Sequence, residues 1–265
     1  MGLVRNNIIK LLPNGIRNRI INAKYKFFDK NKFFVYDGLI TNHNHDFMKD
    51  PLFAEAFKLA IDTGTWGTKN DYLNTKNPYW RGYIVCWAAK QAIHLQGDFV
   101  ECGVYKGALA RMVIHYTGFE NQQKKFYLMD TFEGLIEDQV TEKEKKQGIN
   151  VKEYNVVYAD CYETVRNTFA FCKNVEIIKG IIPDSLTQCK ASEIAYLSID
   201  MNCVAPEIAA LEFFWDKVVT GGFIILDDYG FGTHLNQKLA HDKFAKDRNI
   251  EILTLPTGQG LIIKR

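Results

Sequence analysis

From residue 97 onward, short apolar segments alternate with segments of helical periodicity, and this alternation most limits the possible folds. The apolar segments include DFVEC, KKFYLMD, VEIIKG, IAYLSID and GGFIILDD. Helical segments such as KGALARMVIHY, YETVRNTFAF and PEIAALEFFWDKV lie between them. The pattern predicts an open α/β sheet, mostly parallel and Rossmann-like, with helices on both faces. Only PTGQ separates IEILTL from GLIIKR, so these two strands are expected to form an antiparallel hairpin.

The residues before position 97 have a different texture, dominated by two helical segments. These are DPLFAEAFKLAID and the more apolar YWRGYIVCWAAKQAIHL. We therefore predict an N-terminal helical extension over 1–96 and a sheet domain over 97–265. Residues 1–28 contain basic and apolar residues but no acidic one. Such a segment can lie on an anionic membrane, but Pro13 and Gly15 divide it into short pieces. Packing in a homo-oligomer is favoured over a stable membrane anchor.

The charge balance and the cysteines limit the partners and the cellular compartment that are expected for this chain. Lys and Arg number 33 against 31 Asp and Glu, so no strong basic field favours nucleic acid. The six cysteines form no C-x-x-C pair. They are predicted to be reduced core residues, which is typical of a cytoplasmic protein.

The first strand of the sheet ends in the motif Glu101-Cys-Gly103-Val-Tyr-Lys-Gly107. Glycines at this turn let the backbone approach a ligand closely, because ligands bind at the carboxyl ends of the strands. The spacing lacks the second glycine of the dinucleotide-binding motif. An acidic residue beside the turn would repel a phosphate and suit an amine. Glu101, Gly103 and Gly107 are therefore candidates for binding a cationic ligand.

The second strand ends in Asp130, which Thr131 and Phe132 follow directly. An acidic residue at this position is well placed to accept hydrogen bonds from both hydroxyls of a ribose. Because the first loop is acidic and suits no phosphate, a nucleoside without phosphates is the expected ligand. S-adenosylmethionine has this chemistry.

Three further aspartates follow the next two strands of the predicted sheet. Asp200 ends IAYLSID, and Asp227 and Asp228 end GGFIILDD, with one helix between the two strands. Such a crossover unit brings the strand ends side by side. Two adjacent carboxylates after a buried strand need a positive partner. Oxygen ligands of this kind suit Mg²⁺, or Mn²⁺, so a metal site is predicted here.

The charged stretch EDQVTEKEKKQGINVKEYN interrupts the alternation after the second strand. It is either a solvated surface loop or helix, or a mobile lid over the ligand end of the sheet. Its position in the order of elements favours the lid.

The motifs together resemble the macrocin O-methyltransferase family from about residue 79 to residue 265. The matching pieces are GDFVECGVYKG, MDTFEG, KGIIPDSL, SID, AALEFFWDKVVTGGFIILDDYG and TGQGLIIK. The resemblance implies a class I fold and a Mg²⁺-dependent enzyme that transfers a methyl group from S-adenosylmethionine to a sugar hydroxyl.

The resemblance also implies individual roles for residues of this chain. Glu101, Gly103 and Gly107 would surround the methionine part, and Asp130 the ribose. Gly180 would border the adenine, and Asp200, Asp227 and Asp228 would hold the metal. Where the family usually shows a second Asp and then a Tyr, this chain has Asn202 and Val204. The resemblance therefore does not imply a macrolide as the acceptor.

Four more residues complete the predicted site. His234, shortly after the aspartate pair, is the candidate proton acceptor, with Asp200 as the other catalytic residue; His234 is otherwise a solvent-facing residue at the start of a helix. Trp66, Tyr79 and Arg81 form a candidate platform for a sugar acceptor, or else join the helices to the sheet.

Two other functions stay open at this level. A metal-dependent glycosyltransferase would use a nucleotide sugar, because DMN resembles an acidic pair that binds a diphosphate through a metal. A non-catalytic scaffold would keep the fold and bind a partner through its basic N-terminus. Binding of S-adenosylhomocysteine but not of uridine diphosphate would distinguish the methyltransferase from the first alternative.

Overall fold

A seven-stranded sheet forms the centre of the computed structural model, which describes residues 34–36, 38–66, 78–158 and 160–265. The predictions for residues 1–28 lie outside the described residues. The strands of this sheet are β3 (Asp98–Cys102), β4 (Phe126–Asp130), β5 (Val175–Lys179), β6 (Ile194–Ile199), β7 (Val218–Leu226), β8 (Leu253–Thr254) and β9 (Gly260–Ile263).

The strand order is β5-β4-β3-β6-β7-β9-β8. The strands from β5 to β7 are parallel, and β9 is antiparallel both to β7 and to β8. The order reverses direction at β3, so ligand-binding loops after β3 and β6 diverge at this point. The predicted fold class and the antiparallel C-terminal hairpin are confirmed.

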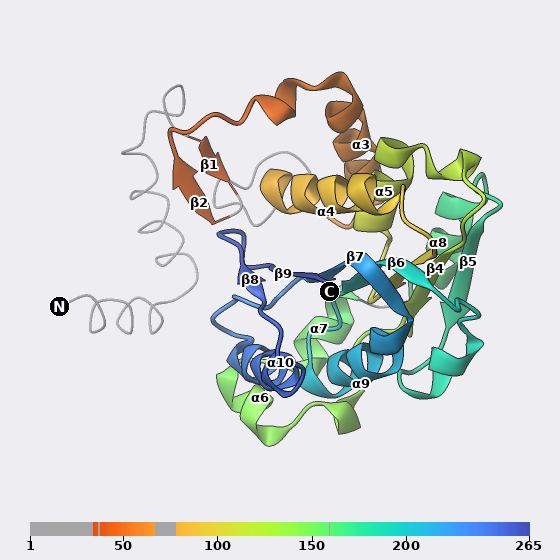
Figure 1. The fold of residues 1–265 in the computed structure, drawn as a ribbon. Coiled ribbons are helices and arrows are strands. Elements are labelled where there is room, and N and C mark those ends of the chain that lie inside the picture. Colours follow the sequence, from red (N-terminus) through yellow and green to blue (C-terminus); the bar gives the residue numbers. More distant parts are fainter. Residues whose placement is uncertain (1–33, 37, 67–77, 159) are drawn as a thin grey trace.

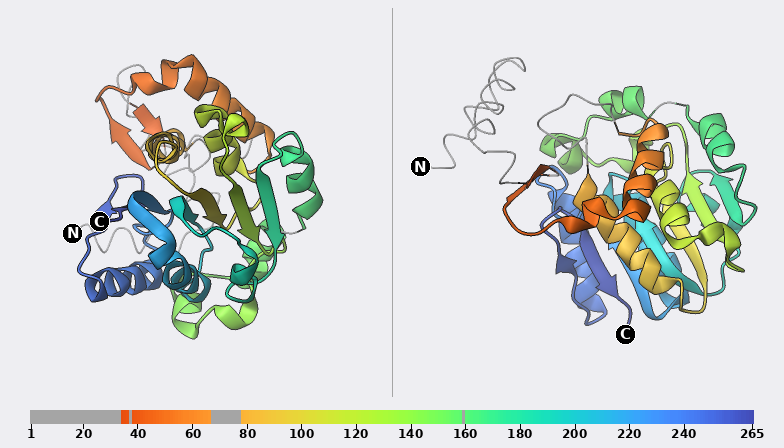
Figure 2. Two further views of the ribbon diagram at one scale, coloured as in Figure 1. Left: turned by 45° about the vertical axis from the view of Figure 1, so that its right-hand side comes forward. Right: turned by 90° about the horizontal axis from the view of Figure 1, so that it is seen from above.

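Helices cover both faces of the sheet (Figures 1 and 2). One face packs against α4 (Tyr79–Ala92), α5 (Ala108–Thr117) and α8 (Tyr162–Phe169). The other packs against α9 (Val204–Phe214) and α10 (Leu235–Asp247). Short 3₁₀ helices complete the described part: η1 (Asp46–Lys49), η2 (Phe119–Asn121), η3 (Glu137–Gln139), η4 (Asp184–Gln188) and η5 (Trp215–Lys217).

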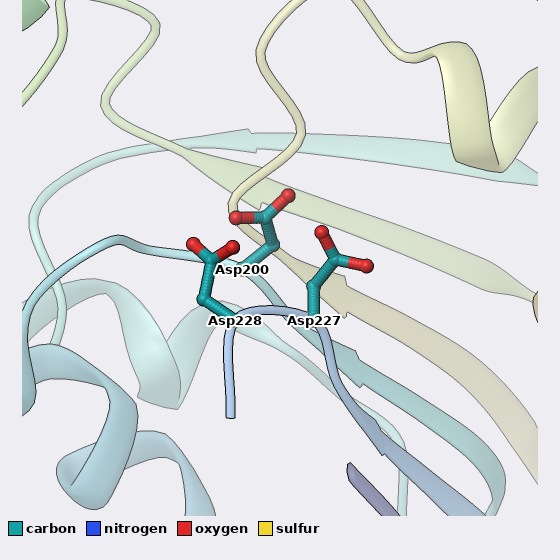
Figure 3. A group of neighbouring side chains, drawn as sticks. All are labelled: Asp200, Asp227 and Asp228. Atoms are coloured by element: carbon teal, nitrogen blue, oxygen red, sulfur yellow. The ribbon is translucent and has the colours of Figure 1, made fainter. Parts of the chain in front are cut away.

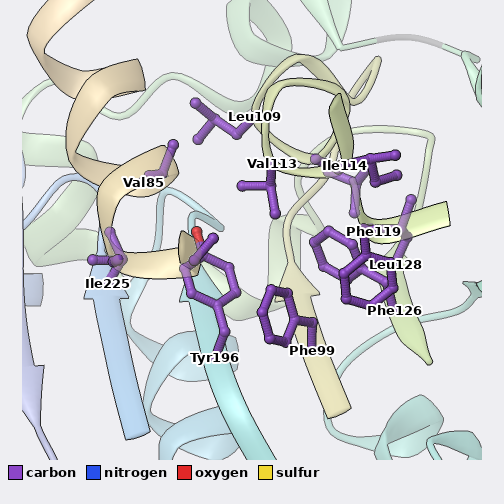
Figure 4. Close-up of a cluster of buried hydrophobic side chains, with 14 of the residues drawn as sticks. Val85, Phe99, Leu109, Val113, Ile114, Phe119, Phe126, Leu128, Tyr196 and Ile225 are labelled. Atoms are coloured by element: carbon purple, nitrogen blue, oxygen red, sulfur yellow. The ribbon is translucent and has the colours of Figure 1, made fainter. Parts of the chain in front are cut away.

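Aromatic side chains fill the core between the sheet and α5 (Figure 4). Phe99, Phe126 and Tyr196 come from three adjacent strands, and their ring centroids lie 5.1–6.5 Å apart. Val85 of α4 belongs to the same buried cluster. Thus α4 packs directly on the sheet, although the predicted domain boundary at residue 96 places it in the N-terminal extension.

A third layer lies outside α5 and begins with a well-capped helix. Asp50 accepts a hydrogen bond from the backbone of Leu52, and Pro51 occupies the first position of α3 (Pro51–Asp62). The buried face of α3 consists of Phe53, Ala56, Phe57 and Ala60. A small hairpin of β1 (Phe34–Tyr36) and β2 (Leu39–Thr41) precedes this layer. No helix of the described residues is long and apolar enough to cross a membrane.

The charged segment after β4 is folded onto the sheet domain. It contains α6 (Glu142–Gln147) and α7 (Val151–Val157), and Thr141 forms a capping box with Glu144 at the start of α6. Apolar residues Val140, Ile149 and Val151 pack on Cys203. The segment is therefore not an irregular loop: it is helical, with many exposed residues and one buried apolar face. Its role as a lid stays a prediction.

Candidate active site

A cavity of about 300 Å³ opens at the carboxyl ends of β3, β4, β6 and β7. Its walls combine strand ends with residues of α4 and of the segment after β4. The predicted residues that line it are Trp66, Arg81, Glu101, Gly103, Asp130, Thr131, Gly180, Asp200, Asp227 and Asp228. Residues from seven separate stretches of sequence thus meet at one edge of the sheet, as the parallel topology requires.

The turn after β3 is shaped by Gly103. Its φ is +86°, and a Cβ atom there would lie 1.8 Å from the backbone oxygen of Asp200. Only glycine permits this approach of β3 to β6. Glu101, at the end of β3, is 2% exposed, and its Oε2 has no hydrogen-bond partner among the described residues. Burial, Asp227 and Asp130 raise the pKa of Glu101 well above its usual range.

Asp130 ties the first two loops together. Its Oδ2 accepts hydrogen bonds from the backbone N–H groups of Val104 (2.6 Å) and Tyr105 (2.8 Å). Its Oδ1 accepts one from the N–H of Phe132 at 2.7 Å. The carboxylate therefore holds the loop after β3 in place and also lines the cavity.

Asp200, Asp227 and Asp228 converge as the sequence predicts (Figure 3). Each offers an oxygen, and these atoms lie within 4.8 Å of one another. Asp200 follows β6, and the pair follows β7, its neighbour in the sheet. The carboxylates are largely buried, with Asp227 at 1% exposure. Such a set of oxygen ligands suits a hard divalent cation.

Three polar side chains hold these carboxylates. Nη1 of Arg81 lies 2.6 Å from Oδ2 of Asp227, and Nε2 of Gln259 donates to Oδ1 of the same residue at 2.9 Å. Nδ2 of Asn202 donates to Oδ1 of Asp200 at 3.3 Å. Asn202 thus contacts the proposed metal site in place of the carboxylate that the family pattern predicts there.

The electrostatics of this cluster favour a bound cation. Burial, followed by the charges of Asp227 and Asp228, raises the pKa of Asp200 well above its usual range. Burial and Asp227 raise the pKa of Asp228 to about 7. A divalent cation would remove both penalties by neutralising the carboxylates. The residues present therefore fit a divalent metal ion.

Four predicted residues lie off the cavity wall. Gly107 is close to the ring of Phe169, which a Cβ would meet at 2.5 Å, so it serves the contact of α5 with α8. Phe132 is 1% exposed and points into the core. Tyr79 stacks on Phe57 with ring centroids 4.2 Å apart. Trp66 does line the cavity, and its ring stacks on the same Phe57 ring with centroids 5.5 Å apart.

His234 is the fourth residue off the wall. It is the N-cap residue of α10 and is 6% exposed, so the interpretation as a solvent-facing residue is wrong. Its Nδ1 is 2.9 Å from Oγ1 of Thr233, and its Nε2 is 3.8 Å from Oδ2 of Asp228. Burial lowers its pKa. The imidazole reaches the cavity only through the Asp228 carboxylate.

Comparison with known families shows to which family the chain belongs. The family model described as Macrocin-O-methyltransferase (TylF) matches residues 85–254, well over half of the chain. The chain belongs to the macrocin O-methyltransferase family. The resemblance seen in the sequence motifs is thereby confirmed.

Relatives of this macrocin O-methyltransferase family member include one curated enzyme and several solved structures. The 8-demethyl-8-(2,3-dimethoxy-alpha-L-rhamnosyl)-tetracenomycin-C 4'-O-methyltransferase of Streptomyces olivaceus is 28% identical over 140 residues, which cover 50% of this chain and 53% of the relative. The match thus spans about half the length of that enzyme.

The solved structures share the fold at low sequence identity. The O-methyltransferase NovP matches with a TM-score of 0.67 and 20% identity over 80% of this chain and 97% of NovP. CalS11, a calicheamicin methyltransferase, matches with a TM-score of 0.58 and 14% identity over 89% of this chain and 96% of CalS11. These matches support the assignment of the sheet to the class I methyltransferase fold.

Sequence reasoning missed two residues of the site. Gln259 is fully buried, and its side chain contacts Asp227 from the turn that precedes β9. In the sequence, this turn is recognisable only as the connection between two strands. Tyr158 lines the cavity just after α7, and burial, followed by the charges of Asp200 and Asp228, raises its pKa. The family motif TGQGLIIK contains Gln259, but no signal in the charged segment points to Tyr158.

Proposed function

We propose that this macrocin O-methyltransferase family member is an S-adenosylmethionine-dependent O-methyltransferase assisted by a divalent cation. Its acceptor would be a hydroxyl of a sugar or of a glycosylated small molecule. One observation carries the proposal: Glu101 and the three-aspartate cluster line the same cavity. A cationic nucleoside and a metal-bound acceptor would then meet within it.

Residues of β3 and β4 would bind the cofactor. The buried Glu101 carboxylate lacks a hydrogen-bond donor for Oε2, and the ammonium of the methionine part would supply one. Asp130 would accept hydrogen bonds from the ribose hydroxyls, with Thr131 beside it, and Gly180 would border the adenine. Gly103 allows the loop to lie close to Asp200, and Gly107 allows the contact of α5 with Phe169, while Phe132 packs in the core.

The aspartate cluster would hold Mg²⁺ or Mn²⁺. When bound, the cofactor supplies an electrophilic methyl group, and the cation lowers the pKa of the acceptor hydroxyl. Asp200, Asp227 and Asp228 would hold the cation at the end of the cavity formed by β6 and β7, where it would help to orient the acceptor. Asn202 fixes the direction of the Asp200 carboxylate.

The acceptor would enter over Trp66 and Arg81, which line the cavity on the α4 side. An indole face with a guanidinium nearby suits a sugar ring. The tetracenomycin relative is named for a rhamnosyl substrate, which favours a glycosylated acceptor for this chain as well. Tyr79 would act indirectly, by supporting Phe57 beneath Trp66.

His234 would accept the proton of the acceptor hydroxyl. Its Nε2 lies 3.8 Å from Oδ2 of Asp228. The proton would therefore reach the imidazole beside the Asp228 carboxylate and not by a direct transfer from the acceptor. The lowered pKa keeps the imidazole neutral, and thus able to accept a proton, at neutral pH.

The cellular setting and the assembly belong to the same proposal. All six cysteines are free and buried, which is typical of a reducing compartment and supports the cytoplasm. We also propose that residues 1–96 act as a cap on the acceptor side and as a contact in a homo-oligomer. Neither nucleic acid nor a stable membrane anchor forms part of the proposed function.

Calorimetry tests the proposal against the two alternatives. S-adenosylhomocysteine should bind, uridine diphosphate should not, and a methylated sugar product should form only with Mg²⁺ or Mn²⁺. Asp200→Asn and Asp227→Asn should each abolish turnover and leave cofactor affinity nearly unchanged. Full activity in excess chelator would exclude a requirement for the metal. Binding of uridine diphosphate without binding of S-adenosylhomocysteine would favour the glycosyltransferase.

A further inference from the structure

Arg81 is a cationic side chain that enters the proposed metal site from another layer of the molecule. It lies in the first turn of α4, and its guanidinium contacts both aspartates that follow β7. Nη1 is 2.6 Å from Oδ2 of Asp227, and Nη2 is 3.9 Å from Oδ1 of Asp228. The guanidinium therefore supplies positive charge to the same oxygens that a divalent cation would use.

The two partners of Asp227 differ in their freedom to move. Gln259 is fully buried, and its Oε1 accepts a hydrogen bond from Thr257, so its Nε2 is fixed against Oδ1 of Asp227. The side chain of Arg81 is 17% exposed and lines the cavity. Its guanidinium also lies 4.7 Å from the centroid of the Phe231 ring. Of the two contacts, the one with Arg81 is the one that can open.

We propose that Arg81 competes with the divalent cation for Asp227 and thereby sets the cation concentration at which the site fills. This inference rests on the proposed function, because it concerns the same aspartate cluster. A cation that binds Oδ2 of Asp227 must displace the guanidinium or bind against its charge. Either way, the charge of Arg81 lowers the affinity for the metal. Once displaced, the guanidinium faces the cavity, where it can bind an acceptor.

The same contact gives Arg81 a structural role in the absence of the cation. Three buried carboxylates within 4.8 Å repel one another, and Arg81 neutralises part of that charge. Removing the guanidinium should therefore destabilise the chelated protein and strengthen metal binding at the same time. A residue that only helped the fold would not produce the second effect.

Arg81→Gln tests the inference through metal affinity rather than through activity. Titration of the full-length chain with Mn²⁺, followed by electron paramagnetic resonance of the free ion, should show binding tightened by about tenfold or more. The melting temperature in chelator should fall, and the rise on adding Mn²⁺ should be larger than in the unchanged protein. Arg81→Lys, which keeps a charge without the planar fork, should change Mn²⁺ affinity less.

Arg248→Gln is the matched control. Arg248 is 23% exposed, pairs with Glu212 and lies 3.8 Å from the centroid of the Phe244 ring, but it does not line the cavity. Its loss should leave Mn²⁺ affinity unchanged. Equal or weaker Mn²⁺ binding by Arg81→Gln overturns the inference while leaving the proposed function in place. Absence of Mn²⁺ binding in every variant, with S-adenosylhomocysteine still bound, overturns both the inference and the metal dependence.

Discussion

At the scale of single residues, Asp130 combines two tasks in one carboxylate. It accepts three backbone hydrogen bonds from Val104, Tyr105 and Phe132, and it lines the cavity where a ribose would bind. A carboxylate oxygen can accept more than one hydrogen bond, so both tasks are compatible. The loop geometry and the cofactor site thus depend on the same side chain.

Asp130→Ala is expected to weaken binding of S-adenosylhomocysteine by about 1.5–3 kcal/mol, the range for hydrogen bonds to a charged group. Isothermal titration calorimetry measures this directly. Glu133→Ala serves as the control, because Glu133 is an exposed acid of the same loop whose carboxylate pairs with Lys179. An unchanged dissociation constant for the Asp130 variant would exclude Asp130 from the ribose site.

His234→Ala is expected to lower kcat by about 10²–10⁴-fold, the usual range for a positioned base. Cofactor and Mg²⁺ affinity should change little, and the acid limb of the pH–rate profile should disappear. His94→Ala is a suitable control, since His94 is exposed. An undiminished kcat in the His234 variant would assign the proton to another acceptor.

His241, a second histidine of α10, does not serve as a neutral control. It is 1% exposed, and its Nε2 lies 3.2 Å from Oε2 of the buried Glu207. Replacing it would remove the contact of Oε2, although Oε1 of Glu207 still accepts hydrogen bonds from Met201 and Gln237. Helical spacing places His241 two turns beyond His234, but spacing alone does not show that this face of α10 is buried.

At the scale of elements, Glu144 links the segment after β4 to the loop that carries Asp200. Its Oε1 accepts a hydrogen bond from the backbone N–H of Val204 at 2.7 Å. Its Oε2 accepts bonds from the N–H and the hydroxyl of Thr141. Glu144, the third residue of α6, completes the capping box of that helix and also caps the first N–H of α9, so the two helices are positioned together.

Glu144→Ala is expected to lower the free energy of unfolding by about 1–3 kcal/mol, because it leaves the half-buried N–H of Val204 unpaired. Amides of residues 137–157 should exchange with deuterium faster, and S-adenosylhomocysteine should bind more weakly. Urea unfolding and hydrogen exchange measure these effects. Glu142→Ala, at a side chain that is 79% exposed, is the control. Unchanged exchange would show that the segment is held by its apolar contacts alone.

The charged segment shows where sequence reasoning reaches its limit at this scale. Its charge pattern indicates an exposed surface but hides Val140, Ile149 and Val151, which are spaced too irregularly to predict a buried face. By contrast, the strands of the sheet are predicted correctly, since buried parallel strands are apolar throughout. Regular periodicity is readable in a sequence, and long-range contacts of single side chains are not.

At the scale of the whole molecule, the aspartate cluster makes stability depend on pH. The pKa of Asp228 in the folded protein, about 7, lies above its value of 3.8 for an exposed side chain. The folded state therefore binds this proton more tightly than the unfolded state. The resulting stabilisation is complete below pH 3.8 and is lost as the pH rises through about 7.

In chelator, the protein is expected to lose stability through this group as the pH rises from about 4 to about 7. Asp228→Asn should flatten that slope, and saturating Mg²⁺ should reverse it, because the cation replaces the proton. Differential scanning calorimetry at several pH values tests the expectation. An identical pH slope in the Asp228 variant would show that Asp228 does not hold the proton.

Much of the site follows from topology that the sequence reveals. Once the strand order is known, Glu101, Asp130, Asp200 and Asp227 must lie at one edge of the sheet. Arg81 and Gln259 were harder to place, because their contacts with Asp227 depend on how α4 and β9 pack. Such packing is set by the volumes of many side chains together rather than by any local motif.

The position of β9 between β7 and β8 has a consequence for synthesis of the protein on the ribosome. Until residues 260–263 have emerged, Phe223, Ile224 and Ile225 present an unpaired strand edge. The Asp227 carboxylate likewise lacks Gln259 until then. A nascent chain can therefore complete the cofactor side of the sheet, from β3 to β5, well before the metal side. Translation that stops before β9 would release a chain with an unpaired apolar strand edge, which is prone to aggregation, and with an incomplete catalytic centre.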